Sequence, residues 1–129
     1  YHETLEDMLP VCQFLSLNCL NTPDTVGLLN ADRIAKLPDG AVVINTARGV
    51  VVDDDALIEA LQSGKLAAAG LDVFNNEPNI DTRYADLPNT FLMPHIGSAT
   101  AETRDAMGFR ALDNLDAFFR GGEPGDRVA

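Results

Sequence analysis

The sequence predicts an α/β fold: the second half of a doubly wound parallel sheet, followed by a C-terminal helix. Short apolar runs alternate with helical segments, the order typical of strand–helix–strand units joined by right-handed crossovers. The run AVVINTA at 41–47 is apolar at nearly every position and rich in β-branched residues. We therefore expect it to be buried on both faces, as strands of parallel sheets are. A doubly wound sheet needs more strands than this chain offers, which indicates a fragment.

Helices are predicted where a capping residue precedes an apolar stripe. Thr4 begins the first helix, with Asp7 at its third position as in a capping box, and Pro10 interrupts it. Asn30 caps the second helix, and Gly64 ends the third. Four helices are expected, at 4–9, 30–37, 53–65 and 98–122. The apolar stripe of the last consists of Met107, Ala111, Leu112, Leu115, Phe118 and Phe119.

Four strands are expected, at 13–19, 41–47, 66–74 and 90–94. By periodicity alone, 66–74 fits a helix as well as a strand. We interpret it as a strand because Gly64 has just ended a helix and Gly70 lies in its middle. Small residues there would let a helix pack closely on the strand.

The composition excludes several classes of function. The chain has 129 residues, enough for one core, and a net charge of −11, which argues against nucleic acid and anionic membranes as partners. No apolar run approaches the ~18–20 residues of a membrane span. We therefore expect a cytoplasmic protein. Cys12 and Cys19 form no CxxC pair, so reduced thiols are expected rather than a metal or redox centre.

Chemically active side chains follow successive predicted strands. Arg48 comes after 41–47, Asp72 and Glu77 belong to the end of 66–74 and its loop, and His95 follows 90–94. Ligands bind at the carboxyl ends of such strands. Each residue alone has a structural alternative: a solvated loop arginine, a strand-end cap, a turn residue or a core histidine. Together they favour one shared site.

Dinucleotide folds of the Rossmann type carry a GxGxxG turn that binds phosphate, and no such turn follows a strand here. Three stretches nevertheless resemble the D-isomer-specific 2-hydroxyacid dehydrogenases: LLNADRIAKLPDGAVVINTARGVVVDDDALIEAL, AAAGLDVFNNEP and LPNTFLMPHIGSAT. The match runs from about residue 5 to residue 119. LSLNCLNTPDT is similar to glycerate dehydrogenases and glyoxylate/hydroxypyruvate reductases. Other members usually carry His at the position of Asn18 and Pro-Leu at Leu20-Asn21.

The resemblance implies hydride transfer between NAD or NADP and a small 2-oxo acid, hydroxypyruvate or glyoxylate. It places the catalytic set on Arg48, Glu77 and His95. His95 would be the general acid or base, Glu77 would orient its ring and favour its charged form, and Arg48 would hold the substrate carboxylate or carbonyl. We expect the His95 ring to face Glu77, with Arg48 across a gap about one small acid wide.

The same resemblance implies a set of cofactor contacts: Cys19, Thr22, Thr25, Thr46, Ala47, Arg48, Asp72, His95, Gly97 and Ser98. For Asp72 and Thr25 the alternative is a cap of the local turn. We expect no metal ligands.

The expected division is 1–97, the C-terminal half of a dinucleotide-binding domain, and 98–129, a helix and tail returning toward a substrate domain. A homodimer is expected for the intact protein. Two alternatives stay open: a corepressor-like protein that senses dinucleotide, and an isolated fragment without activity. The 129-residue chain alone is expected not to turn over, because it lacks the phosphate-binding turn and most of the substrate domain.

Overall fold

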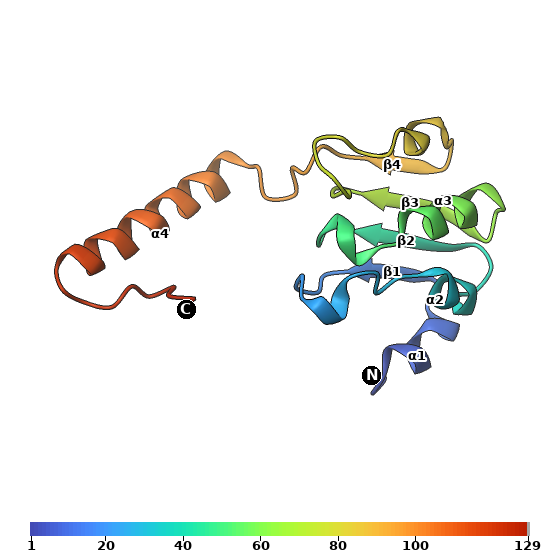
Figure 1. The fold of residues 1–129 in the computed structure, drawn as a ribbon, viewed down its shortest axis with the longest axis horizontal. Helices are drawn as coiled ribbons and strands as arrows, with labels where there is room; N and C mark the ends of the chain where they lie inside the picture. Colours follow the sequence, from blue (N-terminus) through green and yellow to red (C-terminus); the bar gives the residue numbers. More distant parts are fainter. Residues whose placement is uncertain (129) are drawn as a thin grey trace. The chain divides into compact units, whose positions relative to one another are not determined.

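Four parallel strands form one sheet in the order β1-β2-β3-β4 (Figure 1). The computed structural model describes residues 1–128, in which the sheet belongs to a unit spanning Tyr1–His95 and a second unit begins at Ile96. The strands are β1 Phe14–Leu17, β2 Ala41–Asn45, β3 Leu66–Leu71 and β4 Thr90–Leu92. The predicted α/β class is confirmed, although each strand ends earlier than predicted. The residues after each strand leave the sheet and form the loops at its carboxyl edge.

Two helices of the first unit begin at the predicted capping residues, Thr4 and Asn30, and the third is capped by Asp53, the first residue of the predicted range 53–65. The Thr4 side chain accepts from the Asp7 N–H, and Asn30 and Asp53 cap the next two helices in the same way. The helices are α1 Leu5–Met8, α2 Ala31–Lys36 and α3 Asp54–Gln62, with 3-10 turns η1 Leu9–Val11, η2 Pro23–Thr25, η3 Gly49–Val51 and η4 Thr82–Asp86. Pro10 does not end the chain's first helical stretch, because it occupies an early position of a 3-10 turn, where no N–H is needed.

Helices α2 and α3 cover one face of the sheet. Each lies in a crossover between neighbouring strands, and a strand order that advances in one direction puts right-handed crossovers on the same side. The two helices contact each other and share a core with the inward residues of the strands. Its members include Leu15, Leu17, Ile34, Val43, Leu57, Leu61, Leu66 and Leu71.

The opposite face of the sheet is open, and the prediction that β2 is buried on both faces is wrong. Ala41, Val43 and Asn45 are buried, whereas the alternate residues Val42 and Ile44 are only half-buried. On the edge strands β1 and β4, Phe14 and Phe91 are 70% and 68% exposed. No helix described in the first unit covers this face, so the apolar run of β2 has a partner on one side only.

The second unit consists of one long helix and a tail. Helix α4, Ala101–Phe119, is capped by Thr100 and is shorter than the predicted 98–122. Gly121, at φ 79°, ends it: the Gly122 N–H donates to Ala117 O and the Gly121 N–H to Phe118 O. This is a Schellman motif, which needs a left-handed residue at that position.

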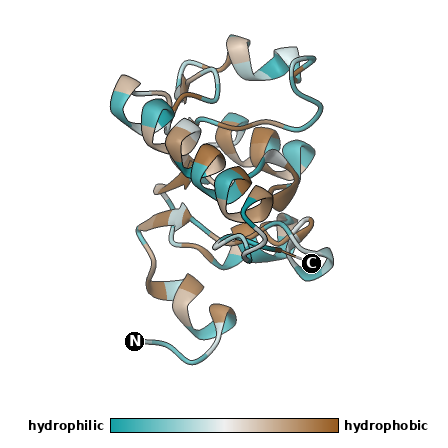
Figure 2. Cartoon of the chain, turned by 90° about the vertical axis from the view of Figure 1, so that its left-hand side faces the viewer, coloured by the Kyte–Doolittle hydropathy of each residue, from teal (hydrophilic) through white to brown (hydrophobic). Residues whose placement is uncertain are grey.

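No residue of α4 is buried, so its apolar side chains are exposed. These include Met107, Phe109, Leu112, Leu115, Phe118 and Phe119. Figure 2 shows how apolar and polar residues follow one another along the helices. In the part of the chain that the structure describes, no helix has the length and apolarity needed to cross a membrane.

Hydrogen bonds from α4 to the Asp126 carboxylate hold the tail against the helix. Arg110 donates to both carboxylate oxygens, Nε to Oδ2 at 2.5 Å and Nη2 to Oδ1 at 2.8 Å, and Asn114 Nδ2 donates to Oδ2 at 2.7 Å. These hydrogen bonds, that of Arg110 foremost, lower the pKa of Asp126 to about 2.

The Asp126 carboxyl of this chain is therefore expected to titrate near pH 2 when its chemical shift is followed by NMR. Since folding lowers the pKa, the contacts are complete at neutral pH and are lost as the pH falls from about 4 toward 2. Arg110→Gln should move the midpoint toward the ~3.9 of a free aspartate. Arg104→Gln, on the same helix, is the control and should leave it unchanged. A midpoint near 4 in the unaltered chain would contradict the expectation.

Candidate active site

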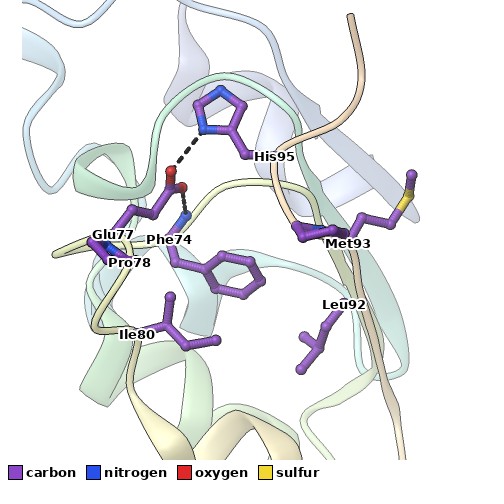
Figure 3. A pocket seen from close by; sticks show the side chains of 8 residues that line it. Phe74, Glu77, Pro78, Ile80, Leu92, Met93 and His95 are labelled. Atoms are coloured by element: carbon purple, nitrogen blue, oxygen red, sulfur yellow. Dashed lines mark hydrogen bonds and ion pairs between the residues drawn. The ribbon is translucent and has the colours of Figure 1, made fainter. Parts of the chain in front are cut away.

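Glu77 and His95 form a hydrogen-bonded pair beyond the carboxyl ends of β3 and β4 (Figure 3). His95 Nδ1 lies 2.7 Å from Glu77 Oε2, so the expectation that the ring faces this carboxylate is confirmed. A carboxylate only accepts hydrogen bonds, so Nδ1 carries the proton in this contact. The other ring nitrogen, Nε2, is then the one that can exchange a proton with a substrate.

The second oxygen of Glu77 is also held. The Phe74 N–H donates to Oε1 at 2.7 Å. The hydrogen bond from His95, supported by that from Phe74, lowers the pKa of Glu77, although partial burial and the Asp72 carboxylate act in the opposite direction. Glu77 is therefore ionised at neutral pH and fixed at both oxygens, which lets it orient the imidazole.

The backbone at both ends of this contact is unusual. His95 has φ 55° and Asn76, next to Glu77, has φ 57°. This left-handed region is uncommon outside glycine, and Asn and His are among the residues that enter it most readily. Such conformations cost of order 1–3 kcal/mol and cluster at functional sites. They turn the two loops so that the side chains meet.

A hollow of about 370 Å³ lies beside the pair. Its lining is apolar apart from Glu77 and His95, and Figure 3 shows the Phe74 ring between the side chains of Ile80 and Leu92. The lining residues are Phe74, Glu77, Pro78, Ile80, Leu92, Met93, Pro94 and His95. The pair itself stays in contact with solvent: the side chains of His95 and Glu77 are 45% and 33% exposed.

Arg48 stands in a loop that the Asn45 side chain holds in shape. Asn45 is buried; its Oδ1 accepts from the Ala47 N–H at 3.0 Å, and its Nδ2 donates to Arg48 O at 3.0 Å. The exposed Arg48 side chain donates from Nη1 to Ala47 O at 2.6 Å. Asn45 is thus the last residue of β2, and its side chain fixes the backbone of the loop at Ala47 and Arg48.

Arg48 does not line the hollow beside Glu77 and His95. It lines a second hollow, of about 490 Å³, that begins at the ends of β1 and β2. The lining residues are Asn18, Cys19, Leu20, Asn21, Thr22, Thr46, Ala47 and Arg48. Five of the predicted cofactor contacts therefore come together here: Cys19, Thr22, Thr46, Ala47 and Arg48. The expected gap between Arg48 and His95 stays a prediction.

Gly49 brings the Arg48 loop into contact with the loop that carries Glu77. A Cβ at Gly49 would lie 1.9 Å from the carbonyl carbon of Phe74 and 2.3 Å from the Asn75 nitrogen. Only a residue without a side chain allows the two backbones to come so close. The loops after β2 and β3 are therefore in direct backbone contact at this point.

The other predicted cofactor contacts lie elsewhere. The Thr25 hydroxyl accepts from the Thr22 N–H at 2.8 Å and donates to Leu20 O at 2.7 Å, which is the turn-capping alternative. Asp72 is buried directly after β3, where its N–H donates to Asn45 O, and it lines neither hollow. Gly97 and Ser98 belong to the second unit.

Four polar residues that shape the site were not predicted from the sequence: Asn45, Asp54, Asn75 and Tyr84. Asn45 could have been noticed, because it is a polar residue inside an otherwise apolar strand. The other three act through contacts between distant parts of the chain. Among residues 1–128, no group of three or more His, Cys, Asp or Glu side chains is placed to hold a metal ion, and Cys12 and Cys19 are free thiols.

Comparison with known proteins identifies the family. Residues 1–97 match the model of the D-isomer specific 2-hydroxyacid dehydrogenase, NAD binding domain. The chain is 50% identical over 123 residues to glycerate dehydrogenase of Hyphomicrobium methylovorum, covering 95% of this chain and 38% of that protein. It is 46% identical over 121 residues to glyoxylate/hydroxypyruvate reductase B of Pectobacterium atrosepticum, covering 93% and 38%.

A solved structure shows the same fold. The NADPH-dependent glyoxylate/hydroxypyruvate reductase of Sinorhizobium meliloti, in complex with NADP and malonate, superposes with a TM-score of 0.95 at 43% identity, covering 100% of this chain and 40% of that one. The chain thus spans about two fifths of the length of these relatives. From the matched domain, the fold and the shared sequence, this chain belongs to the D-isomer specific 2-hydroxyacid dehydrogenase family.

Proposed function

We propose that the complete protein carrying this chain transfers a hydride between NAD(P)H and a small 2-oxo acid. The preferred substrates are hydroxypyruvate, which gives D-glycerate, and glyoxylate, which gives glycolate. The hydrogen bond between His95 Nδ1 and Glu77 Oε2 carries the proposal, because it supplies an oriented acid–base group at the ligand-binding edge of the sheet. The names of the relatives support the substrate class.

The second hollow fits part of a dinucleotide. It lies at the carboxyl edge of the sheet, and Thr22 and Thr46 line it beside Arg48. We assign Cys19 and Thr22 to the nucleotide part of the cofactor, and Thr46, Ala47, Arg48 and Asp72 to its nicotinamide. His95, Gly97 and Ser98 stay predicted contacts near the nicotinamide. When bound, NAD(P)H supplies the hydride. The residues of this chain hold the substrate and move the proton.

His95 then exchanges the proton from Nε2. In the reducing direction a protonated His95 donates to the substrate carbonyl oxygen as charge develops there, and in the oxidising direction the neutral ring accepts the hydroxyl proton. Glu77 keeps the other nitrogen, Nδ1, protonated and the ring in place. Arg48 holds the substrate carboxylate through a planar pair of donors. Retention of the acid–base pair argues against a sensor that only binds dinucleotide.

The remaining features follow from the same proposal. Residues 1–97 form the C-terminal half of the dinucleotide-binding domain, and 98–129 return toward the substrate domain of the complete protein. We propose a cytoplasmic homodimer. The net charge of −11 supports the absence of nucleic acid and anionic membrane partners.

The proposal is tested by the loss of reduced nicotinamide absorbance when the complete protein is mixed with hydroxypyruvate or glyoxylate and either NADH or NADPH. Turnover with at least one of the four combinations is expected. Absence of turnover with all four, in a protein shown to be folded, would contradict the proposal.

Replacing Arg48 with lysine in the complete protein is expected to raise KM for the oxo acid. Lysine keeps the charge but cannot copy the two parallel donors of guanidinium. A lost charge-assisted hydrogen bond of about 1.5–3 kcal/mol corresponds to a decrease in kcat/KM of roughly 10- to 100-fold. Arg83→Lys is the control, since Arg83 pairs with Asp55 and Asp81 away from both hollows. An unchanged KM would remove Arg48 from the substrate site.

A further inference from the structure

A single carboxylate, that of Asp54 at the start of α3, holds both ends of the segment that carries Glu77. Asn75 Nδ2 donates to Asp54 Oδ2 at 2.9 Å, and the Tyr84 hydroxyl donates to Asp54 Oδ1 at 2.7 Å. Asn75 lies two residues before Glu77, and Tyr84 lies seven residues after it. The chain between them is thereby closed into a loop against the N-terminus of α3.

The Asn75 amide and the Tyr84 hydroxyl both act as donors in this contact. The Asn75 amide also donates to Val52 O at 3.3 Å, which fixes which way its nitrogen points. Tyr84 is 1% exposed, and burial, followed by the hydrogen bond to Asp54, raises the pKa of its hydroxyl, so it remains a donor. A carboxylate can accept both hydrogen bonds; an amide in the same place would accept one and oppose the other donor with its own NH₂.

Phe74 connects the Asp54 contacts with Asn75 and Tyr84 to the acid–base pair. Phe74, adjacent to Asn75, donates its N–H to Glu77 Oε1 at 2.7 Å. Its ring packs on that of Tyr84 with centroids 6.1 Å apart. Movement of Asn75 or Tyr84 would therefore displace Phe74, and with it one of the two hydrogen bonds that fix Glu77.

We propose that Asp54 is a positioning residue that holds the Glu77–His95 pair in its catalytic geometry by closing the 75–84 loop through Asn75 and Tyr84. The inference rests on the proposed function for its kinetic part. Its structural part concerns only the hydrogen bond between His95 and Glu77, which exists whether or not the protein is a dehydrogenase.

Asp54→Asn in the complete protein is expected to lower kcat about tenfold while leaving the Kd for cofactor unchanged; a misplacement of roughly 1 Å can cost ~10²-fold. Tyr84→Phe keeps the ring and removes only the hydroxyl, so a smaller loss in the same direction is expected. The matched control is Asp55→Asn, one residue further along α3. Its carboxylate is 83% exposed and pairs with Arg83 of the same loop, but Asp81 also holds Arg83 and an ion pair this exposed contributes little, so kcat should not change.

A double-mutant cycle separates positioning from general stability. In the Glu77→Gln background, Asp54→Asn should cause little further loss of kcat, because its effect passes through Glu77. Equal losses in both backgrounds, or a lower unfolding temperature with unchanged kcat, would overturn the proposal.

The proton NMR signal of the His95 Nδ1–H···Glu77 hydrogen bond gives a readout that needs no activity. It should weaken or shift in Asp54→Asn and persist in Asp55→Asn. If His95→Ala and Glu77→Gln leave turnover unchanged, the proposed catalytic roles of the pair fail, and the NMR comparison still decides the positioning role. An unchanged signal in Asp54→Asn overturns it.

Discussion

Replacing His95 with alanine in the complete protein is expected to lower kcat for reduction of the oxo acid by ~10²–10⁴-fold, the usual contribution of a general acid. His95 Nδ1 is hydrogen-bonded to the Glu77 carboxylate at 2.7 Å. The other ring nitrogen, Nε2, remains available and would supply the proton. The measurement is steady-state turnover at saturating cofactor, combined with the Kd for cofactor. That Kd should change much less than kcat. The substitution removes the proton donor and leaves unchanged the hollow at Arg48, which is proposed to bind the cofactor.

The chain offers a matched control in its second histidine. His2 is exposed near the N-terminus and makes no contact with the pair, so His2→Ala should leave kcat unchanged. Turnover of His95→Ala that stays within about tenfold of the unaltered protein between roughly pH 6 and pH 8 would show that His95 is not the acid.

The parts of the fold set by local chemistry were predictable. Thr4 and Asn30 cap helices because their side chains reach an N–H three residues ahead, and sequence spacing reveals such contacts directly. The burial of β2 was not predictable in the same way. An apolar run indicates that a strand can be buried on both faces, but whether Val42 and Ile44 are covered depends on elements outside the run.

The candidate site also contains contacts that could be predicted from the sequence and contacts that could not. Glu77 and His95 follow neighbouring parallel strands, so their meeting could be predicted from strand order, and the structure confirms it. Asp54 reaches Asn75 and Tyr84 across 21 and 30 residues of sequence. No local pattern distinguishes Asp54 from its neighbour Asp55, whose side chain is turned to solvent. Contacts of this kind depend on how α3 packs on the loops.

Gly49→Ala is expected to destabilise the protein by about 1–3 kcal/mol or more, the range for atoms forced into a filled space. The new Cβ would lie 1.9 Å from the Phe74 carbonyl carbon, whereas carbon atoms in contact are separated by about 3.5–4.0 Å. The opposing atoms belong to the backbone of Phe74 and Asn75, so no side chain can rotate away. The free energy of unfolding, measured by urea denaturation of the complete protein, reports this cost.

Gly70→Ala is the matched control. Gly70 lies in β3, its φ is not in the left-handed region, and a Cβ there would meet only Ile44 Cγ1, at 4.0 Å. Its free energy of unfolding should change by less than ~1 kcal/mol. The relief of strain in Gly49→Ala must come from separating the loops of Arg48 and Glu77, so kcat should fall by roughly 10- to 100-fold in the protein that remains folded. Equal stability and equal turnover of the two variants would show that the backbone contact at Gly49 neither stabilises the fold nor joins the substrate-holding loop to the acid–base pair.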